Sequence, residues 1–326
     1  MLGGSRGRVA GERPIQVYRL APGMENLWPT DGWAGQLSRG PGLLSLGRVR
    51  GSTSVGAMNG MDCPARPFDI DTGPGVRIHG FEMGPAGGPP VVILHGLAGS
   101  AREFFATARA LPEFRTVLID LRGHGRSSRR PDDLSREAFT ADVVRVIEAV
   151  VGAPVTLVGQ SMGGHTAMLV AACRPDLVSR LVLLESGAGG GSEAENERLG
   201  DYFRSWPLPF SDTAAAQDFL GNSPLAQAWV DDLEERPDGL RPRFEADIMV
   251  ATMNGLIPPR WDEWQRTAVP SLVVYGEHGM FAAEDKAEFC ERGRNVRRVE
   301  LAGASHDSHL DAFESWIVAF RSFLQV

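Results

Sequence analysis

The sequence predicts an α/β protein built on a doubly wound, mostly parallel sheet, with a helical cap inserted after the sixth strand. From Phe68 onward, short apolar runs rich in Val, Ile and Leu alternate with stretches of helical spacing. Such runs are typical of parallel strands that helices cover on both faces. One interval of roughly 85 residues lacks a clear strand, and an unstructured loop of that length is rare in a compact domain. That interval is the predicted cap.

The predicted elements follow in chain order. Gly75–Met83 alternates in part between apolar and polar residues, which indicates an antiparallel strand or hairpin arm. Parallel strands are expected at Val91–Leu94, Thr116–Leu121, Val155–Val158, Leu181–Leu184, Ser271–Tyr275 and Arg298–Leu301. Helices are expected between them at Ala101–Leu111, Ser135–Val151, Met162–Cys173, Ala283–Gly293 and His309–Phe323. Alternation of strand and helix predicts a parallel sheet.

Residues 1–60 differ from the rest of the chain. They are rich in Gly, Ser and Arg and show no sustained period, so we expect a disordered or poorly ordered extension. Met58 and Met61 lie where the ordered pattern begins, so an artefact of the assigned start site is an alternative to a genuine extension. The core is expected in two parts, residues 61–186 and 269–326.

The predicted cap, residues 187–268, opens with the glycine-rich segment Gly187–Gly191, which we interpret as a hinge. Its aromatic side chains either line a pocket or pack in a core, and core packing is the favoured interpretation for each of them. They are Tyr202, Phe203, Trp206, Phe210, Phe219, Trp229, Trp261 and Trp264.

Composition narrows the class of protein. The formal net charge of −8 and the lack of a Lys/Arg cluster argue against a nucleic-acid partner. Three cysteines far apart make a disulfide framework unexpected and indicate a reducing cytoplasm. No run approaches the ~20 apolar residues of a membrane span, and the N-terminus lacks the apolar region of a secretory signal. The expected partner is a small-molecule substrate.

The segment Gly159–Gly163 is the strongest functional signal. It has the pattern Gly-x-Ser-x-Gly, follows the strand Val155–Val158 and opens a helix. A serine on such a sharp turn has strained backbone angles and needs small neighbours. The turn exposes its hydroxyl above the sheet edge, and the helix N-terminus places partial positive charge beneath it. We therefore predict Ser161 as a nucleophile, with an ordinary turn serine as the alternative.

Three other segments accompany this turn in a fixed order. His95–Leu97 follows one strand, Asp120–Ser127 follows the next, and Leu301–His306 follows the last. With these segments the chain resembles the α/β-hydrolase superfamily from about Phe68 to its C-terminus, in particular its serine esterases and lipases. The resemblance implies a triad in the chain order serine, acid, histidine.

A serine hydroxyl needs an imidazole to take its proton. The family order favours His306, which lies on a loop beyond the last strand, and His309 is the alternative base. His95 and His124 are expected to shape loops, and His165 is expected on the helix after the nucleophile. His278 is expected in a loop near the site, where it could only contact substrate.

The acid departs from the commonest family pattern. Members usually carry an aspartate a few residues beyond the strand Ser271–Tyr275, and here glycine stands at that place. Glu185, at the end of the strand after the nucleophile, offers a carboxylate where some members place theirs. An uncompensated imidazolium is costly, so one carboxylate must replace the missing aspartate. Glu185 is the preferred acid, although it could instead cap the hinge or pair with an arginine. The alternative acids are Glu277, Asp285 and Asp307, whereas Asp120 is expected to be structural.

The oxyanion hole needs two preorganised N–H donors. Position in the fold assigns them to the amides of Met162 and Leu97. No His-Glu-x-x-His, paired-cysteine set or nucleotide-binding fingerprint occurs, so we expect neither a metal nor a cofactor.

The predicted function is hydrolysis of a small or medium apolar ester, thioester or amide through an acyl-Ser161 intermediate with a Ser-Glu-His triad. An aromatic-rich cap favours an apolar substrate. The alternatives on the same fold are a carbon–carbon bond hydrolase, a perhydrolase resembling haloperoxidases, or a biosynthetic acyl transferase or cyclase. A non-catalytic ligand-binding relative is the alternative from another class.

Overall fold

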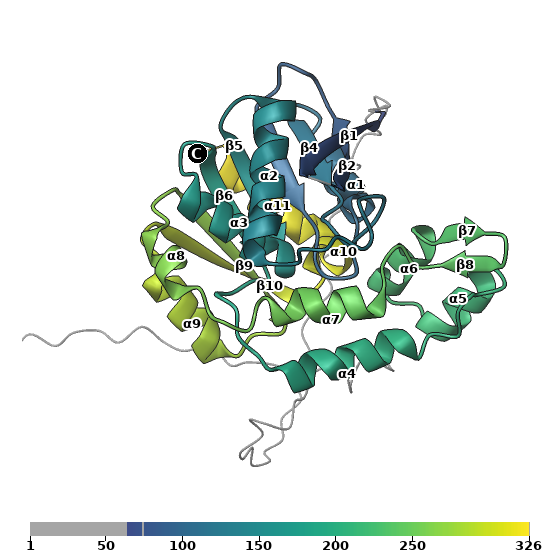
Figure 1. The fold of residues 1–326 in the computed structure, drawn as a ribbon. Helices are drawn as coiled ribbons and strands as arrows, with labels where there is room; N and C mark the ends of the chain where they lie inside the picture. The colour runs from purple at the N-terminus through teal and green to yellow at the C-terminus, as the bar shows by residue number, and fades with distance from the viewer. Residues whose placement is uncertain (1–63, 74, 326) are drawn as a thin grey trace, which may run out of the picture.

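The computed structural model describes residues 64–73 and 75–325, so the expected extension 1–60 lies outside the described residues. An eight-stranded sheet runs through the described part in the order β1-β2-β4-β3-β5-β6-β9-β10 (Figure 1). Its strands are β1 (Arg66–Gly73), β2 (Val76–Met83), β3 (Pro90–Leu94), β4 (Arg115–Ile119), β5 (Val155–Gln160), β6 (Val178–Leu184), β9 (Ser271–His278) and β10 (Val296–Ser305). Strand β2 pairs antiparallel with β1 and β4, and all other pairs are parallel. The predicted α/β fold class is confirmed.

Helices cover both faces of the sheet, as the apolar runs predict. They are η2 (Ala101–Phe104), α1 (Phe105–Arg109), α2 (Arg136–Val146), the π-helical η3 (Ile147–Val151), α3 (Met162–Cys173), α8 (Trp261–Arg266), α9 (Ala283–Arg292), α10 (Ser308–Asp311) and α11 (Phe313–Leu324). Alternate side chains of one strand enter different layers, because a strand has a period of two. In β3, Val92 and Leu94 pack with α2 and α3, whereas Val91 and Ile93 pack with α1 and α11.

The strands at the two edges of the sheet differ most from expectation. Strand β1 is absent from the predicted elements, and β10 is longer than the predicted Arg298–Leu301. Strand β1 alternates between exposed and partly buried residues, and β10 is mostly exposed or partly buried, with Leu301 and Ala304 buried. A search for continuous apolar runs detects strands covered on both faces, so it misses β1 and finds only part of β10, because water reaches both edge strands.

The insert after β6 is mainly helical. It contains α4 (Glu193–Arg204), α5 (Thr213–Leu220), α6 (Pro224–Asp231), α7 (Ala246–Asn254) and a short hairpin, β7 (Glu234–Arg236) with β8 (Gly239–Arg241). The sequence did not predict this hairpin, whose strands are only three residues long. Helices α4 and α7 lie side by side beneath the sheet in Figure 1. The division at residues 187 and 268 stays a prediction, and α8 packs on α3 of the core.

Most aromatic side chains of the insert form a core of their own. This cap cluster includes Phe203, Trp206, Phe210, Trp229 and Phe244, whose rings contact one another. Trp264 instead stacks on Phe289 in the main core. Core packing is therefore what the structure shows for these rings.

No helix of residues 64–73 and 75–325 combines the length and apolar character that crossing a bilayer requires.

Candidate active site

Ser161 lies in the sharp turn between β5 and α3. Its φ of 52° is in the left-handed region, which a residue with a side chain adopts only under strain. Its amide donates to the Leu184 carbonyl of the neighbouring strand at 2.9 Å. The turn is crowded, because a Cβ on Gly163 would clash with the backbone of His95 and Leu94. Small residues beside Ser161 are thus required by sterics, as the sequence pattern indicated.

His306 and Glu185 meet across the carboxyl edge of the sheet. His306 Nδ1 lies 3.2 Å from Glu185 Oε2, although 121 residues separate the two in sequence. The Glu185 side chain is fully buried. Its carboxylate also accepts the amide of Gly276 at 2.6 Å and that of Met280 at 3.0 Å. Backbone donors of this kind stabilise a buried negative charge and hold its orientation.

Gly279 leaves the space that Glu185 occupies. A Cβ built on Gly279 would clash with the Glu185 carboxylate. Gly279 lies in the loop after β9, where family members usually carry their aspartate. Therefore an aspartate at position 279 and a glutamate at position 185 cannot both fit in this geometry.

The alternative acids lie elsewhere. The Glu277 carboxylate accepts the Gly303 amide at 2.8 Å and lies 4.0 Å from His278. Asp285 is exposed in the first turn of α9. Asp307 Oδ1 lies 3.5 Å from the Gln160 side-chain amide. Thus Glu185 is the candidate acid for which the structure has a hydrogen bond to the His306 ring.

His309, His95 and His124 have structural contacts, whereas His165 on α3 lines the same cavity as Ser161 and His306. His309 is buried, stacks on Phe104 and lies 3.7 Å from the Glu103 carboxylate. His95 accepts the Leu121 amide at 2.9 Å, and its Nδ1 lies 2.6 Å from the Gly96 carbonyl. His124 likewise contacts a backbone carbonyl, that of Arg122. Burial lowers the pKa of His95 to about 4, so its ring is neutral at pH 7 and its Nδ1 carries the proton.

Asp120 has the structural role that the sequence indicates. Its carboxylate accepts the amide of Ala101 at 2.8 Å and that of Arg126 at 2.9 Å. Arg122 does not bond to this carboxylate, because its guanidinium pairs with the buried Asp142 at 2.6 Å.

The environment of His306 favours its protonated form. Burial lowers the pKa of this imidazole, but the hydrogen bond to Glu185 and the negative charges of Asp307, Glu185 and Asp311 outweigh burial and raise the pKa above its ordinary value. A base of raised pKa takes a proton more readily from a hydroxyl, provided that the solution leaves it neutral.

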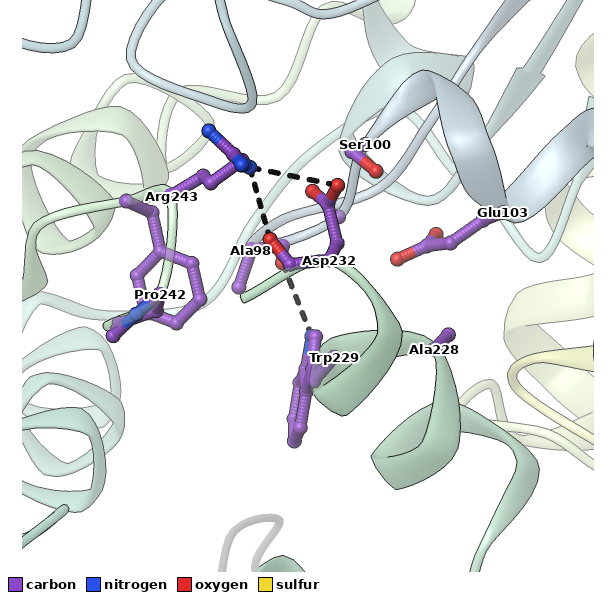
Figure 2. Close-up of a pocket in the computed structure, with 10 residues that line it drawn as sticks. Ala98, Ser100, Glu103, Ala228, Trp229, Asp232, Pro242 and Arg243 are labelled. Atoms are coloured by element: carbon purple, nitrogen blue, oxygen red, sulfur yellow. Dashed lines mark hydrogen bonds and ion pairs between the residues drawn. The ribbon is translucent and has the colours of Figure 1, made fainter. Parts of the chain in front are cut away.

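The loop after β3 carries Leu97 and is held from the cap as well as from the core. Ala98 has a φ of 57°, and its carbonyl accepts the indole N–H of Trp229 from α6 at 3.0 Å. Figure 2 shows Trp229 beneath this loop, with Asp232 and Arg243 beside it. The cap therefore contacts the backbone next to the predicted oxyanion donor.

Ser161 and His306 open into one cavity of about 280 Å³. Its apolar walls come from Met162, Met253, Leu256, Met280 and Phe281. Polar groups of Asn196 and Glu195 line it from α4, and glycines of the hinge complete it. The aromatic side chains of the predicted cap, from which we expected an apolar substrate, do not line this cavity. Its apolar lining comes instead from the methionines, Leu256 and Phe281. Among residues 64–73 and 75–325, no group of three His, Cys, Asp or Glu side chains is placed to hold a metal ion.

The fold and this site define an α/β hydrolase. The family model described as alpha/beta hydrolase fold matches residues 89–313, and the chain belongs to this family.

Named relatives agree with that class. A putative esterase/lipase of Haemophilus influenzae is 37% identical over 247 residues, which cover 72% of this chain and 83% of that protein. The sn-1-specific diacylglycerol lipase ABHD11 of Mus musculus is 43% identical over 100 residues. That match covers 30% of this chain and 32% of the mouse protein, so the chain aligns with about a third of its length. The crystal structure of E-2-(acetamidomethylene)succinate hydrolase superposes with a TM-score of 0.74 at 22% identity, covering 81% of this chain and all of that one.

The sequence did not predict the contacts that Gln160 and Trp229 make near this site. Gln160 stood in the motif only as a variable position. For Gly279 the sequence does carry a signal, because a glycine stands at the usual place of the aspartate and a glutamate follows the strand after the nucleophile. Trp229 carried no local signal, because 131 residues separate it from Ala98.

Proposed function

We propose that the chain is a serine hydrolase that cleaves small or medium apolar esters, and by the same chemistry thioesters or amides. One observation carries this proposal. The strained Ser161 shares a cavity with His306, and Nδ1 of that imidazole lies 3.2 Å from the buried Glu185 carboxylate. Nucleophile, base and orienting acid are the parts that acyl transfer through serine needs. The esterase and lipase names of the relatives support the same class.

In the proposed acylation step, His306 Nε2 takes the proton of Ser161 as its Oγ attacks the carbonyl carbon. The amides of Met162 and Leu97 donate hydrogen bonds to the oxygen that becomes negative. The C–O bond of the ester then breaks, and the imidazolium returns its proton to the leaving alcohol. Glu185 stabilises the imidazolium and holds its ring in place.

Deacylation repeats these roles with water as the nucleophile. His306 removes a proton from water, which attacks the acyl carbon of acyl-Ser161. The bond to Ser161 Oγ breaks, and the proton on His306 passes to that oxygen. The products are a carboxylic acid and the free enzyme.

The cavity supports a substrate of modest size. Its volume of about 280 Å³ lies near the lower limit of the ~300–1,000 Å³ range of small-molecule sites. Because five of its lining side chains are apolar, burial of a hydrocarbon portion contributes to binding, at roughly 0.8 kcal/mol per CH₂ group. We expect kcat/KM for ester hydrolysis to rise as a short acyl chain is lengthened, and to fall once the chain is too long for the cavity.

A fluorophosphonate probe and p-nitrophenyl esters of increasing chain length test this proposal. Rapid labelling that Ser161→Ala abolishes, together with ester hydrolysis, is the expected result. A wild-type protein that is not labelled would instead be a binding protein. Labelling without hydrolysis of any ester in the series would point to acyl transfer, carbon–carbon bond cleavage or perhydrolase chemistry on the same serine.

A further inference from the structure

Gln160 joins two loops that come from distant parts of the chain. It is the last residue of β5, directly before Ser161, and its side chain is buried. Its Nε2 donates to the His306 carbonyl at 3.2 Å and lies 3.5 Å from Asp307 Oδ1. Its Oε1 fills the space next to Gly96, where a Cβ would clash with it.

The sheet does not make this connection by itself. Strand β3, which leads into Gly96, pairs directly with β5. Strand β10, which leads into His306, is separated from β5 by β6 and β9. Gln160, at the carboxyl edge of β5, links the His306 loop to the loop that carries Leu97, in addition to the stacking of His309 on Phe104.

We propose that Gln160 is a positioning residue, which holds the Leu97 loop and the His306 loop at a fixed spacing around Ser161. This inference rests on the proposed function and adds a residue to it. Misplacement of a reacting group by ~1 Å can lower a rate by about 10²-fold, so such a contact affects turnover without touching substrate.

The side-chain amide of Gln160 matches the hydrogen-bonding groups of the His306 loop that it faces. The NH₂ group faces two oxygen acceptors, the His306 carbonyl and the Asp307 carboxylate. A carboxylate of the same shape would place oxygen against oxygen and leave the His306 carbonyl without this donor. The contact thus distinguishes glutamine from its isosteres, which a merely space-filling role would not.

Kinetics of Gln160→Met and Gln160→Glu test the role on a p-nitrophenyl ester that the wild type hydrolyses. We expect kcat to fall by about tenfold to a hundredfold in Gln160→Met, and further in Gln160→Glu, with KM within about twofold of the wild-type value. The labelling rate of Ser161 by a fluorophosphonate should fall in parallel. Thr116→Val is a matched control, because Thr116 is a buried residue of β4 whose hydroxyl has no hydrogen-bond partner among the described residues. It should leave kcat, KM and labelling unchanged.

A double-mutant cycle tests the contact directly. Gly96→Ala should lower kcat in the wild type, where its methyl group displaces the Gln160 amide. In a Gln160→Ala background the space is free, so the same change should cost little. An equal loss of kcat from Gly96→Ala in both backgrounds would overturn the inference, and so would a wild-type kcat in Gln160→Met. In either case, labelling of wild-type Ser161 would still support the proposed function.

Discussion

At the scale of single residues, the choice of acid depends on where two carboxylates point. Glu185 contacts the His306 ring and two backbone amides, whereas Glu277 accepts the Gly303 amide. We expect Glu185→Gln to lower turnover of a p-nitrophenyl ester by a factor on the order of 10³–10⁴, as loss of the orienting acid does in serine hydrolases. Glu277→Gln is the matched control and should cause a modest fall. The reverse ranking would reject Glu185 as the acid.

The same geometry predicts that the acid can be moved. Gly279→Asp alone should reduce both stability and activity, because the new side chain collides with Glu185. Glu185→Gly alone should be nearly inactive. In the double variant the Asp carboxyl has the vacated space, so we expect kcat to recover above that of either single variant. A double variant no more active than Glu185→Gly would contradict this steric account of Gly279.

The pH dependence of the reaction follows from His306. Because the base must be neutral, activity should fall as pH drops through a midpoint above 6.5, the ordinary value from which the pKa of His306 is raised. Removing the Glu185 charge and hydrogen bond lowers that pKa. The acidic limb of kcat/KM for Glu185→Gln should therefore lie at lower pH than in the wild type, measured on its residual activity. An unmoved limb would show that another group controls it.

At the scale of elements, one contact links the cap to the catalytic edge of the core. Trp229 of α6 donates to Ala98, next to the predicted oxyanion donor Leu97. Trp229→Phe keeps an aromatic ring but removes the N–H donor. We expect kcat to fall about tenfold, because the Leu97 loop loses its hydrogen bond to the cap. Trp206→Phe is the matched control in the same cap cluster, since the hydrogen bond to the Ala98 carbonyl comes from Trp229. Equal kinetics for the two variants would refute the link.

At the scale of the whole molecule, a buried acid makes stability depend on pH. Glu103 lies between the Leu97 loop and the cap, where Figure 2 shows its carboxyl turned toward Asp232. Burial, with the charges of Asp232 and Asp120, raises the pKa of Glu103 to about 8. The folded protein thus holds this proton more tightly than the unfolded chain. The resulting stabilisation is complete below pH 4.5, the ordinary pKa, and is lost as pH rises through about 8.

Glu103→Gln removes this dependence. We expect the variant to have a higher Tm than the wild type at about pH 9 and a similar Tm at about pH 4, as thermal unfolding would measure. Glu235→Gln, on the exposed cap hairpin, should follow the wild type at both pH values. If Glu103→Gln and the wild type differ equally at the two pH values, Glu103 does not titrate as described.

The sequence by itself determined the fold class, and it predicted the place of the insert and the roles of Ser161 and His306. The reason is local: buried strands need continuous apolar runs, and the turn at Ser161 needs small neighbours within a few residues. The preference for Glu185 also depends on a local feature, its position directly after a predicted strand.

Only the tertiary structure decided which carboxylate contacts the imidazole, because Glu185 directly follows β6 and Glu277 lies near the end of β9, at the same edge of the sheet. It also decided that the cap aromatics pack with one another and that Gln160 spans two loops. These contacts join residues more than a hundred positions apart or depend on the direction of a side chain. No period or motif along the chain encodes such distances, since they arise when separate elements pack together.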